Sequence, residues 1–409
     1  MSVGRPGKLI FVNRYFYPDH SATSQLLTDL GLYLTEHIGD REIHIVTSRQ
    51  LYQDPNVELE QQELHQGIHI HRVYSTRFGR GKLLGRSLDY LTFYLSSLFY
   101  LIFNVSKEDQ VIAKTDPPLI SVIAAIATRL RGAEQINWMQ DMFPEIATAL
   151  DISIPSFVTR LVTGARNWSL RVAKTNVVLG SKMADKLVEN GISRDAIRII
   201  DNWTVSDSIT PVDRSDNRLA ADWGLQESFV VEYSGNMGRA HEYDTILDAA
   251  RRLRSENIVF LFIGSGALMD DLKQQVSRES LHNCQFKPYQ DQDRLAESLS
   301  VGDAHLISLL PELEGLIVPS KLYGILGVGR PVIFIGSDDG EIARYIDKYG
   351  FGVTVGVHDG EALAETILRL RTDSEYTSGL ADNSLAVSRE HLSRERSLSA
   401  WHAVLTREN

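Results

Sequence analysis

Apolar and polar positions in the first half of the chain alternate between two patterns. Short runs rich in Val, Ile and Phe predict strands, and segments with apolar residues at helical spacing, such as 23–36 and 119–130, separate most of them. This alternation is typical of βαβ units around a parallel sheet. The predicted strands of this half are 8–16, 42–48, 68–75, 110–116, 134–141 and 176–181.

The alternation breaks at residues 203–221, which are polar, contain Pro211 and therefore predict a linker. A second alternation follows, with helical patterns at 245–254 and 361–371, and residues 374–409 carry no strand signal. The predicted strands of this half are 229–238, 258–266, 284–290, 304–310, 331–337 and 352–357.

We therefore predict an α/β protein with two Rossmann-like, doubly wound parallel-sheet domains that face each other across a cleft. The chain of 409 residues is long enough for two such cores. Doubly wound sheets bind ligands at the carboxyl ends of their strands, so we expect the site in the cleft. The predicted parts are a first domain at 1–202, a linker at 203–221, a second domain at 222–373, and helices at 374–409 that could pack back on the first domain.

Charge and cysteine content exclude several classes of protein. The net charge of −11 and the pI of about 5.6 argue against a nucleic-acid binder. The single cysteine, Cys284, rules out a disulfide framework and a cysteine-based metal site. The N-terminal residues lack the long apolar region and the cleavage site of a signal peptide, so we expect a reducing, cytoplasmic location.

Two glycine-rich corners follow predicted strands of the second half. In the motif SGNMGR, Gly235 and Gly238 permit a tight turn whose amides can approach a phosphate, and Arg239 adds a positive charge near a helix start. Gly264 and Gly266 lie at an equivalent corner. The structural alternative is that any turn between a strand and a helix favours glycine.

A third corner combines acidic residues with a lysine. Glu312 and Glu314 follow a predicted strand, and a helix opens near Pro319 and Ser320. Lys321 lies in the first turn of that helix, where the helix dipole disfavours a cation, so its presence indicates an anion nearby. The alternative is a solvated lysine on a surface helix.

Motifs from both halves occur in a recognisable order. They are NRYFYPDHSATSQLLTDLGLYL (13–34), KTDPPL (114–119), NWMQDMFPEIATAL (137–150), IIDNW (199–203), VVEYSGNMGRAHEYDTILDAA (230–250), FIGSG (262–266), FKPYQ (286–290) and VPSKLYGILGVGRPVI (318–333). In this order they resemble the retaining GT-B glycosyltransferases of glycosyltransferase family 4, the glycogen-synthase and mannosyltransferase type. The resemblance is closest to the WbuB-like colanic-acid and O-antigen transferases and spans nearly the whole chain.

The resemblance implies a retaining enzyme that binds a nucleotide-diphosphate sugar in the second domain and its acceptor in the first. It implies no metal and no other cofactor, because cations and amide dipoles stabilise the departing diphosphate. The loop at 286–289 would hold the base. The donor-binding candidates are Gly235, Asn236, Gly238, Arg239, Gly264, Gly266, Pro288, Tyr289, Glu314, Ser320 and Lys321; the catalytic candidates are Asp141, Lys321 and Arg239; the acceptor-side candidates are Tyr17, Pro18, Asp19, Ser21 and Thr23.

The chain departs from the family pattern at two places. The family's glutamate pair would fall on Leu316 and Gly324, neither of which is acidic, so ribose recognition would come from Glu314 or backbone groups instead. The lysine that usually follows the loop arginine is missing from AHEYD (240–244). Its absence makes Lys321 the best candidate for a second phosphate-binding cation.

Two further candidates have structural alternatives. Asp141 follows the fifth predicted strand, where an acid/base or orienting group is expected, but it could instead cap a helix beginning near Pro144. His69 and His71 alternate with apolar residues in a predicted strand. That pattern favours an exposed strand face over a metal site.

Residues 77–86 carry four positive charges and no acid, and they lead into 87–105, which is rich in Leu, Phe and Tyr. The apolar part is short for a spanning helix. We therefore expect 77–105 to contact the inner face of the plasma membrane, where a lipid-linked acceptor would lie. The alternative is a buried core helix.

The predicted function is sugar transfer to a lipid-linked or oligosaccharide acceptor in surface-polysaccharide biosynthesis. One alternative is another enzyme of similar architecture, either a nucleotide-sugar epimerase, with acid and histidine pairs in both domains, or a phosphorylase, with a lysine for pyridoxal phosphate. A second alternative is an inactive nucleotide-sugar-binding subunit, which the missing glutamates suggest.

Overall fold

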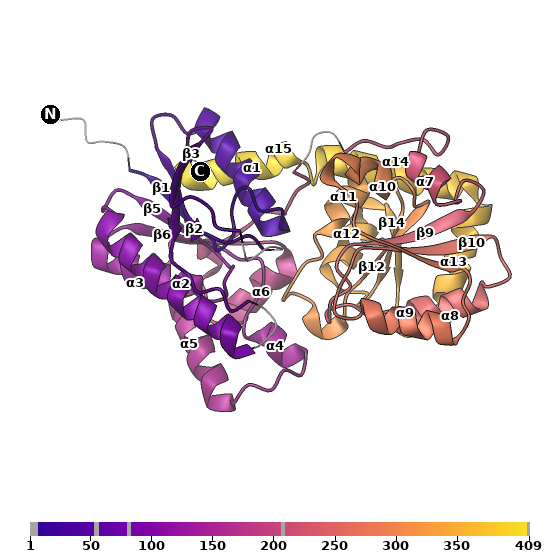
Figure 1. The fold of residues 1–409 in the computed structure, drawn as a ribbon, viewed down its shortest axis with the longest axis horizontal. Helices are drawn as coiled ribbons and strands as arrows, with labels where there is room; N and C mark the ends of the chain where they lie inside the picture. The colour runs from indigo at the N-terminus through magenta and orange to yellow at the C-terminus, as the bar shows by residue number, and fades with distance from the viewer. Residues whose placement is uncertain (1–6, 53–56, 80–82, 206–208, 407–409) are drawn as a thin grey trace. The chain divides into compact units, whose positions relative to one another are not determined.

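The computed structural model describes residues 7–52, 57–79, 83–205 and 209–406 (Figure 1). The chain divides into two compact units. The first unit comprises Met1–Asp201 together with Ser397–Asn409, and the second comprises Asn202–Arg396.

The first unit is built on an eight-stranded sheet. Its strands are β1 (Leu9–Val12), β2 (Ile43–Ser48), β3 (Gln62–His65), β4 (Ile68–Val73), β5 (Gln110–Lys114), β6 (Glu134–Trp138), β7 (Thr175–Val178) and β8 (Ile197–Ile199). Their order is β3-β4-β2-β1-β5-β6-β7-β8; β3 runs antiparallel to β4, and the other neighbours pair parallel. Strands β1, β2 and β5 are buried at every position, which explains their continuous apolar runs.

Helices flank this sheet, and one of them comes from the far end of the chain. They are α1 (Ala22–His37), α2 (Leu83–Asn104), α3 (Ile120–Arg131), α4 (Glu145–Ala149), α5 (Ser156–Val172), α6 (Ser181–Glu189) and α15 (Arg394–Thr406). Helix α3 packs between α2 and α5 (Figure 1). The ring of Trp401 on α15 is fully buried against that of Trp138 on β6, with centroids 4.6 Å apart.

The second unit is built on a six-stranded sheet. Its strands are β9 (Phe229–Ser234), β10 (Ile258–Ile263), β11 (Cys284–Lys287), β12 (Ala304–Ser308), β13 (Val332–Ile335) and β14 (Gly352–Val355), in the order β11-β10-β9-β12-β13-β14, and all neighbours pair parallel. Its helices are α7 (Arg218–Asp222), α8 (Asp244–Arg252), α9 (Met269–Arg278), α10 (Leu295–Leu299), α11 (Lys321–Gly327), α12 (Glu341–Tyr349), α13 (Gly360–Thr372) and α14 (Ser374–Glu390).

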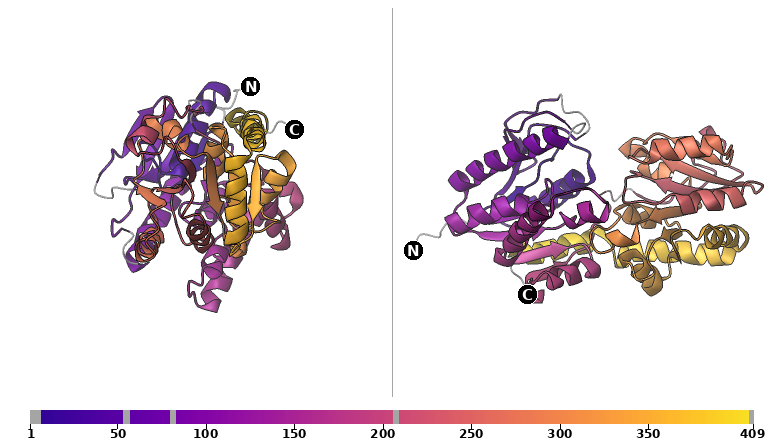
Figure 2. Two further views of the ribbon diagram at one scale, coloured as in Figure 1. Left: turned by 90° about the vertical axis from the view of Figure 1, so that its right-hand side faces the viewer. Right: turned by 90° about the horizontal axis from the view of Figure 1, so that it is seen from below.

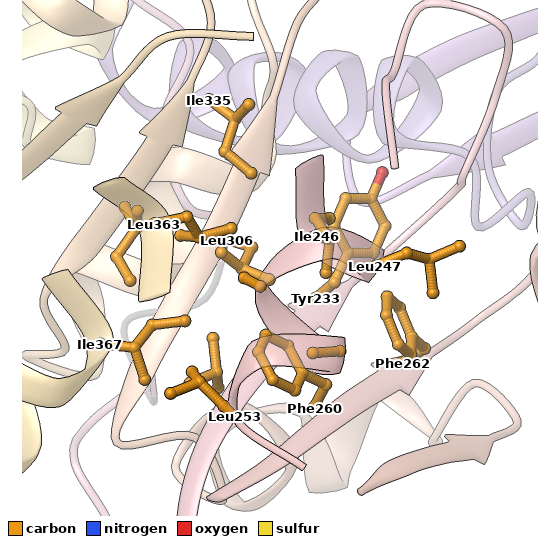
Figure 3. Close-up of a cluster of buried hydrophobic side chains, with 14 of the residues drawn as sticks. Tyr233, Ile246, Leu247, Leu253, Phe260, Phe262, Leu306, Ile335, Leu363 and Ile367 are labelled. Carbon is orange, nitrogen blue, oxygen red and sulfur yellow. The ribbon is translucent and has the colours of Figure 1, made fainter. Parts of the chain in front are cut away.

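Helices cover both faces of this second sheet (Figures 1 and 2). Helices α8 and α13 pack together on one face, and α11 packs with α14 on the other. Alternate strand residues such as Tyr233, Phe260 and Leu306 join Ile367 of α13 in a buried apolar cluster (Figure 3).

In each sheet, the direction in which successive strands are added reverses at one point. This point lies between β1 and β5 in the first unit and between β9 and β12 in the second. Loops that leave the carboxyl ends of two such strands diverge to opposite faces of the sheet and leave room for a ligand. The motifs KTDPPL and SGNMGR follow β5 and β9, respectively. The topology therefore gives each unit one candidate ligand position.

The structure corrects the predicted elements. Strands β3 and β8 were not predicted, because β3 is polar and partly exposed and β8 has only three residues. Most predicted strands also run too long at their carboxyl ends; for example, 229–238 ends at Ser234, where the loop begins.

The predicted boundaries at 203–221 and 374–409 also differ from the observed units. Within the predicted linker, Asn217 caps helix α7 through a bond from the Ala220 amide, and Leu219 is buried in the second unit. Helix α14 belongs to the second unit, whereas residues from Ser397 onward belong to the first. The sequence gives no boundary between these C-terminal helices, because neither carries a strand signal.

Candidate active site

Two glycine-rich loops interlock at the carboxyl ends of β9 and β10. Gly235, Gly264 and Gly266 have φ angles of 131°, 124° and 148°, which residues with side chains rarely adopt. A Cβ on Gly264 would lie 2.4 Å from the Gly235 carbonyl oxygen, and one on Gly266 would lie 2.3 Å from that of Met237. The Met237 amide donates to the Ser265 carbonyl at 2.7 Å. These glycines are therefore needed for the loops to approach each other.

Lys321, the first residue of α11, reaches the same loops. Its Nζ lies 3.6 Å from the centroid of the Tyr233 ring and 3.6 Å from the position of a Cβ on Gly235. This Nζ is buried and has no hydrogen-bond partner in the part of the chain that the structure describes. Desolvation lowers the pKa of Lys321 to about 7. An unpaired buried cation is costly, so the arrangement favours an anionic ligand. Ser320, just before it, makes no capping bond with its side chain.

Arg239 lies in the turn between β9 and α8. Its side chain is exposed and makes no hydrogen bond or ion pair with the described residues. The sequence placed Arg239 near a helix start, but helix α8 begins only at Asp244. Asn236 and Gly238 lie in the same turn, and the Asn236 carbonyl accepts a bond from the Tyr233 hydroxyl at 3.1 Å. The turn presents a cation that is free to meet a ligand.

The loop after β11 contributes Pro288 and Tyr289, both exposed. The Tyr289 ring would lie 3.0 Å from a Cβ on Gly264, so it borders the glycine-rich loops. Phe286 instead stacks on Phe262 of the core, with ring centroids 5.2 Å apart. Of the two aromatic residues at 286–289, Tyr289 is therefore the one beside these loops.

Glu314 contributes to the fold of the second unit. Its side chain is buried, and its Oε2 accepts a bond from the Glu341 amide, at the start of α12, at 3.2 Å. Leu316 is buried, and Gly324 lies within α11 close to Leu299. No acid stands at either position of the family's glutamate pair, and the ribose contact of Glu314 stays a prediction.

In the first unit, Asp141 lies shortly after β6. Helix α4 begins at Glu145 with no side-chain cap, so Asp141 does not have the capping role considered from the sequence. Glu145 itself pairs with Arg166. The Asp141 side chain keeps contact with solvent, yet desolvation by the surrounding protein, and second the charge of Asp116, raise its pKa to about 6. A carboxyl group with such a pKa suits proton transfer near neutral pH.

Two acceptor-side candidates are engaged in internal contacts. The buried Asp19 carboxylate accepts bonds from the amide of Ser21, at 2.8 Å, and from the amide of Tyr52. The Tyr17 ring stacks on that of His65 with centroids 3.8 Å apart. These contacts shape the turn after β1, and a direct contact of either side chain with an acceptor stays a prediction.

A buried lysine contacts the start of α1, the helix that follows this turn. Lys114, at the end of β5, donates from Nζ to the Thr23 carbonyl at 2.8 Å and lies 3.6 Å over the Trp138 ring. Desolvation lowers its pKa well below the usual value. Pro18 and Thr23 remain partly accessible at this turn. Nothing in the sequence distinguishes Lys114 from other lysines; only its burial does.

The strand histidines form a stack. The His44 ring lies 4.8 Å from that of His69 and 5.2 Å from that of His71, and His44 Nδ1 is 2.9 Å from His71 Nε2. Burial and then the neighbouring His44 lower the pKa of His71 to about 4. Among the described residues, no group of three or more His, Cys, Asp or Glu side chains is arranged to hold a metal ion.

Helix α2 has one buried side and one exposed apolar side. Phe93 and Leu101 are fully buried in the core of the first unit, as the core-helix alternative proposed. The opposite side follows a spacing of three or four residues, so its side chains form one stripe. The stripe consists of Leu84, Leu88, Leu91, Leu95, Phe99 and Phe103, which are 46% to 80% exposed.

Of the basic residues in 77–86, Arg77 precedes α2 and pairs with Glu58 at 2.8 Å, whereas Arg86 lies in the first turns of α2 and is exposed. Arg80 and Lys82 lie outside the described residues. A search of the described helices finds none that is long and apolar enough to cross a membrane.

The comparisons with known proteins agree with this geometry. Residues 228–373, which contain both glycine-rich loops and Lys321, match the family of group 1 glycosyl transferases. The chain is 27% identical over 295 residues to the probable glycosyltransferase WbjE of Pseudomonas aeruginosa, covering 71% of this chain and 73% of the relative. It is 26% identical over 293 residues to the putative colanic acid biosynthesis glycosyl transferase WcaI of Escherichia coli, covering 69% and 72%, respectively. Among solved structures, HepE of Anabaena in complex with UDP-glucose matches with a TM-score of 0.68 at 15% identity, covering 98% of this chain and 99% of that one.

The chain has two Rossmann-like parallel-sheet domains with C-terminal helices, and HepE matches it over nearly its whole length. This architecture is the GT-B fold. The chain is a nucleotide-sugar glycosyltransferase; its residues 228–373 match the group 1 glycosyl transferases, and it is similar to WbjE and WcaI.

Proposed function

We propose that this enzyme transfers a sugar, with retention of configuration, from a UDP-sugar to a lipid-linked or oligosaccharide acceptor in surface-polysaccharide biosynthesis. The observation that carries the proposal is the buried, unpartnered Nζ of Lys321 beside the interlocked glycine loops. The names of relatives point the same way, since WcaI is described as acting in colanic acid biosynthesis and HepE was solved with UDP-glucose.

The diphosphate of the donor fits the surroundings of Lys321. The open loop at Gly235 lets phosphate oxygens come close to the backbone, and Lys321 and Arg239 supply two positive charges. Tyr289 offers an exposed ring beside Gly264 for the base, and Pro288 borders it. Glu314 and Ser320 would act by fixing the loops that lie around these groups.

The two cations would also act in the chemical step. When the bond from the anomeric carbon to the diphosphate breaks, negative charge grows on the leaving oxygen, and a cation held beside it lowers the barrier. Asp141, with its raised pKa, would orient or deprotonate the acceptor hydroxyl. This mechanism uses side-chain charges and backbone dipoles and needs no metal ion.

We also propose that α2 holds the enzyme on the inner face of the membrane, where a lipid-linked acceptor would be available. A soluble protein rarely leaves six large apolar residues exposed along one helix, and Arg86 at its beginning suits an anionic surface. The inner side of α2 is tied to the turn after β1, because Asp89 accepts a bond from Arg14 at 3.5 Å. A surface-bound α2 would therefore lie close to the proposed acceptor position.

Release of UDP tests the transfer. The enzyme is mixed with UDP-glucose and related UDP-sugars, with and without a lipid extract containing polyprenyl-linked saccharides. We expect UDP release that depends on the extract. Binding of the UDP-sugar without any release would support the inactive-subunit alternative, and conversion of the UDP-sugar into an isomer would support the epimerase.

A further inference from the structure

His241 is fixed at the point where β9 and β12 diverge. Three hydrogen bonds tie its segment to the end of β12: from the Leu310 amide to the Ala240 carbonyl at 3.0 Å, from the Glu242 amide to Ser308 Oγ at 3.2 Å, and between His241 Nδ1 and the Ser308 carbonyl at 2.5 Å. Backbone and ring are therefore both held before any ligand binds, which is what a recognition residue requires.

The contact with Ser308 also sets which ring nitrogen carries the proton. A carbonyl oxygen only accepts hydrogen bonds, so Nδ1 must be the donor, and in the neutral ring Nε2 then presents a lone pair. Nε2 makes no hydrogen bond with the described residues, and the ring is only partly buried. His241 thus offers one fixed, unused acceptor.

This acceptor lies beside the cation of the donor site. The His241 ring meets the Tyr233 ring edge-on, with centroids 5.9 Å apart, and the same Tyr233 ring lies 3.6 Å from Lys321 Nζ. Burial and, second, the charge of Lys321 lower the pKa of His241 to about 3, so the ring stays neutral at physiological pH. A neutral histidine with a bare Nε2 does not neutralise a phosphate.

We propose that His241 recognises the donor by accepting, at Nε2, a hydrogen bond from a hydroxyl group next to the diphosphate. This inference rests on the proposed function, because it takes the diphosphate to lie at Lys321. An ionised diphosphate has no proton to donate, whereas the sugar and the ribose on its two sides both carry hydroxyl groups. Leu316 and Gly324, at the positions of the family's glutamate pair, have no side-chain hydrogen-bond acceptor. A fixed acceptor at His241 would supply one for the donor's hydroxyl groups.

The test compares variants that separate the two ring nitrogens. In His241→Asn, the side-chain amide can still donate to the Ser308 carbonyl, but nothing reaches the position of Nε2. His282→Asn is the matched control, because His282 is an exposed histidine of the same unit. Calorimetry measures the affinities of the full chain and both variants for UDP-glucose, for UDP, and for UDP without ribose hydroxyls.

We expect His241→Asn to weaken UDP-glucose binding about 3- to 10-fold, the scale of one neutral hydrogen bond, and His282→Asn to leave it unchanged. If the hydroxyl belongs to the hexose, UDP binding stays unchanged. If it belongs to the ribose, UDP binding weakens equally, and the effect vanishes with the ribose analogue.

Unchanged affinity of the folded His241→Asn variant for UDP-glucose would overturn the inference. So would an equal loss for all three ligands, because the effect would then not depend on a hydroxyl group. Failure of the unmodified chain to bind UDP is a different result, which would contradict the proposed donor and, with it, this inference.

Discussion

Replacing Lys321 with methionine should lower catalysis and raise stability at the same time. The variant keeps the approximate length of the side chain but removes the charge beside Gly235 and Tyr233. Turnover at saturating donor should fall by about 10²–10³, the scale for losing one preorganised charge-stabilising group. Donor affinity should fall less, because the cation acts most on the charge that develops in the transition state.

The stability gain follows from the pKa of Lys321. Burial lowers that pKa from 10.5 to about 7, so between these two values the native state binds fewer protons than the unfolded chain. The stability of the parent therefore rises with pH from about 7 to 10.5, and at pH 7 the buried group costs on the order of 4 kcal/mol. Lys321→Met removes this cost and should raise the Tm of the ligand-free protein by several degrees at pH 7.

Calorimetric unfolding at pH 7 and pH 9.5, together with a steady-state assay, measures both effects. We expect the gap in Tm between variant and parent to shrink at the higher pH. Normal turnover of Lys321→Met at saturating donor would refute its catalytic role. A lower Tm at pH 7 would refute the view that the ligand-free site carries an unpaired cation.

Arg239→Ala should weaken binding of UDP by roughly 1.5–3 kcal/mol, because it removes a charged hydrogen bond, and an unchanged affinity in calorimetry would place the arginine outside the site. Asp141→Asn should keep the Tm within a few degrees and reduce turnover by about 10²–10⁴. The turnover rate of the parent should fall as pH drops through about 6, where the Asp141 carboxylate becomes protonated. Ordinary turnover of the variant would exclude the acid/base role. Leu91→Glu combined with Leu95→Glu should abolish sedimentation with anionic vesicles, whereas Leu64→Glu, a change at an even more exposed leucine on β3, should not. If the double variant pelleted like the parent, α2 would not be the docking surface.

The positions of most strands along the chain could be predicted from the sequence far better than the strand ends. Buried parallel strands such as β10 are continuous apolar runs, which the sequence displays directly. The loop residues that follow them are also partly apolar, so the predicted strands ran on into the site. Helix α7 was missed because it is only five residues long and lies in a polar stretch, and only the packing of Leu219 and Ala220 within the second unit identifies it.

For the site, the sequence located motifs but not their environments. Gly235, Gly264 and Lys321 could be selected because each lies near the end of a predicted strand or opens a predicted helix. The sequence carries no sign that Lys321 Nζ is buried without a partner, since this depends on Tyr233 and on two loops far apart in the chain. His241 was passed over for the same reason, because its tautomer is set by Ser308 on another strand.

A crystal structure of the enzyme with UDP tests the position of the diphosphate most directly. We expect a phosphate oxygen within about 3 Å of Lys321 Nζ, the distance of a charge-assisted hydrogen bond, with the diphosphate lying against the loop at Gly235. UDP bound away from Lys321, or a Lys321 side chain left without an anion in a crystal saturated with UDP, would contradict it.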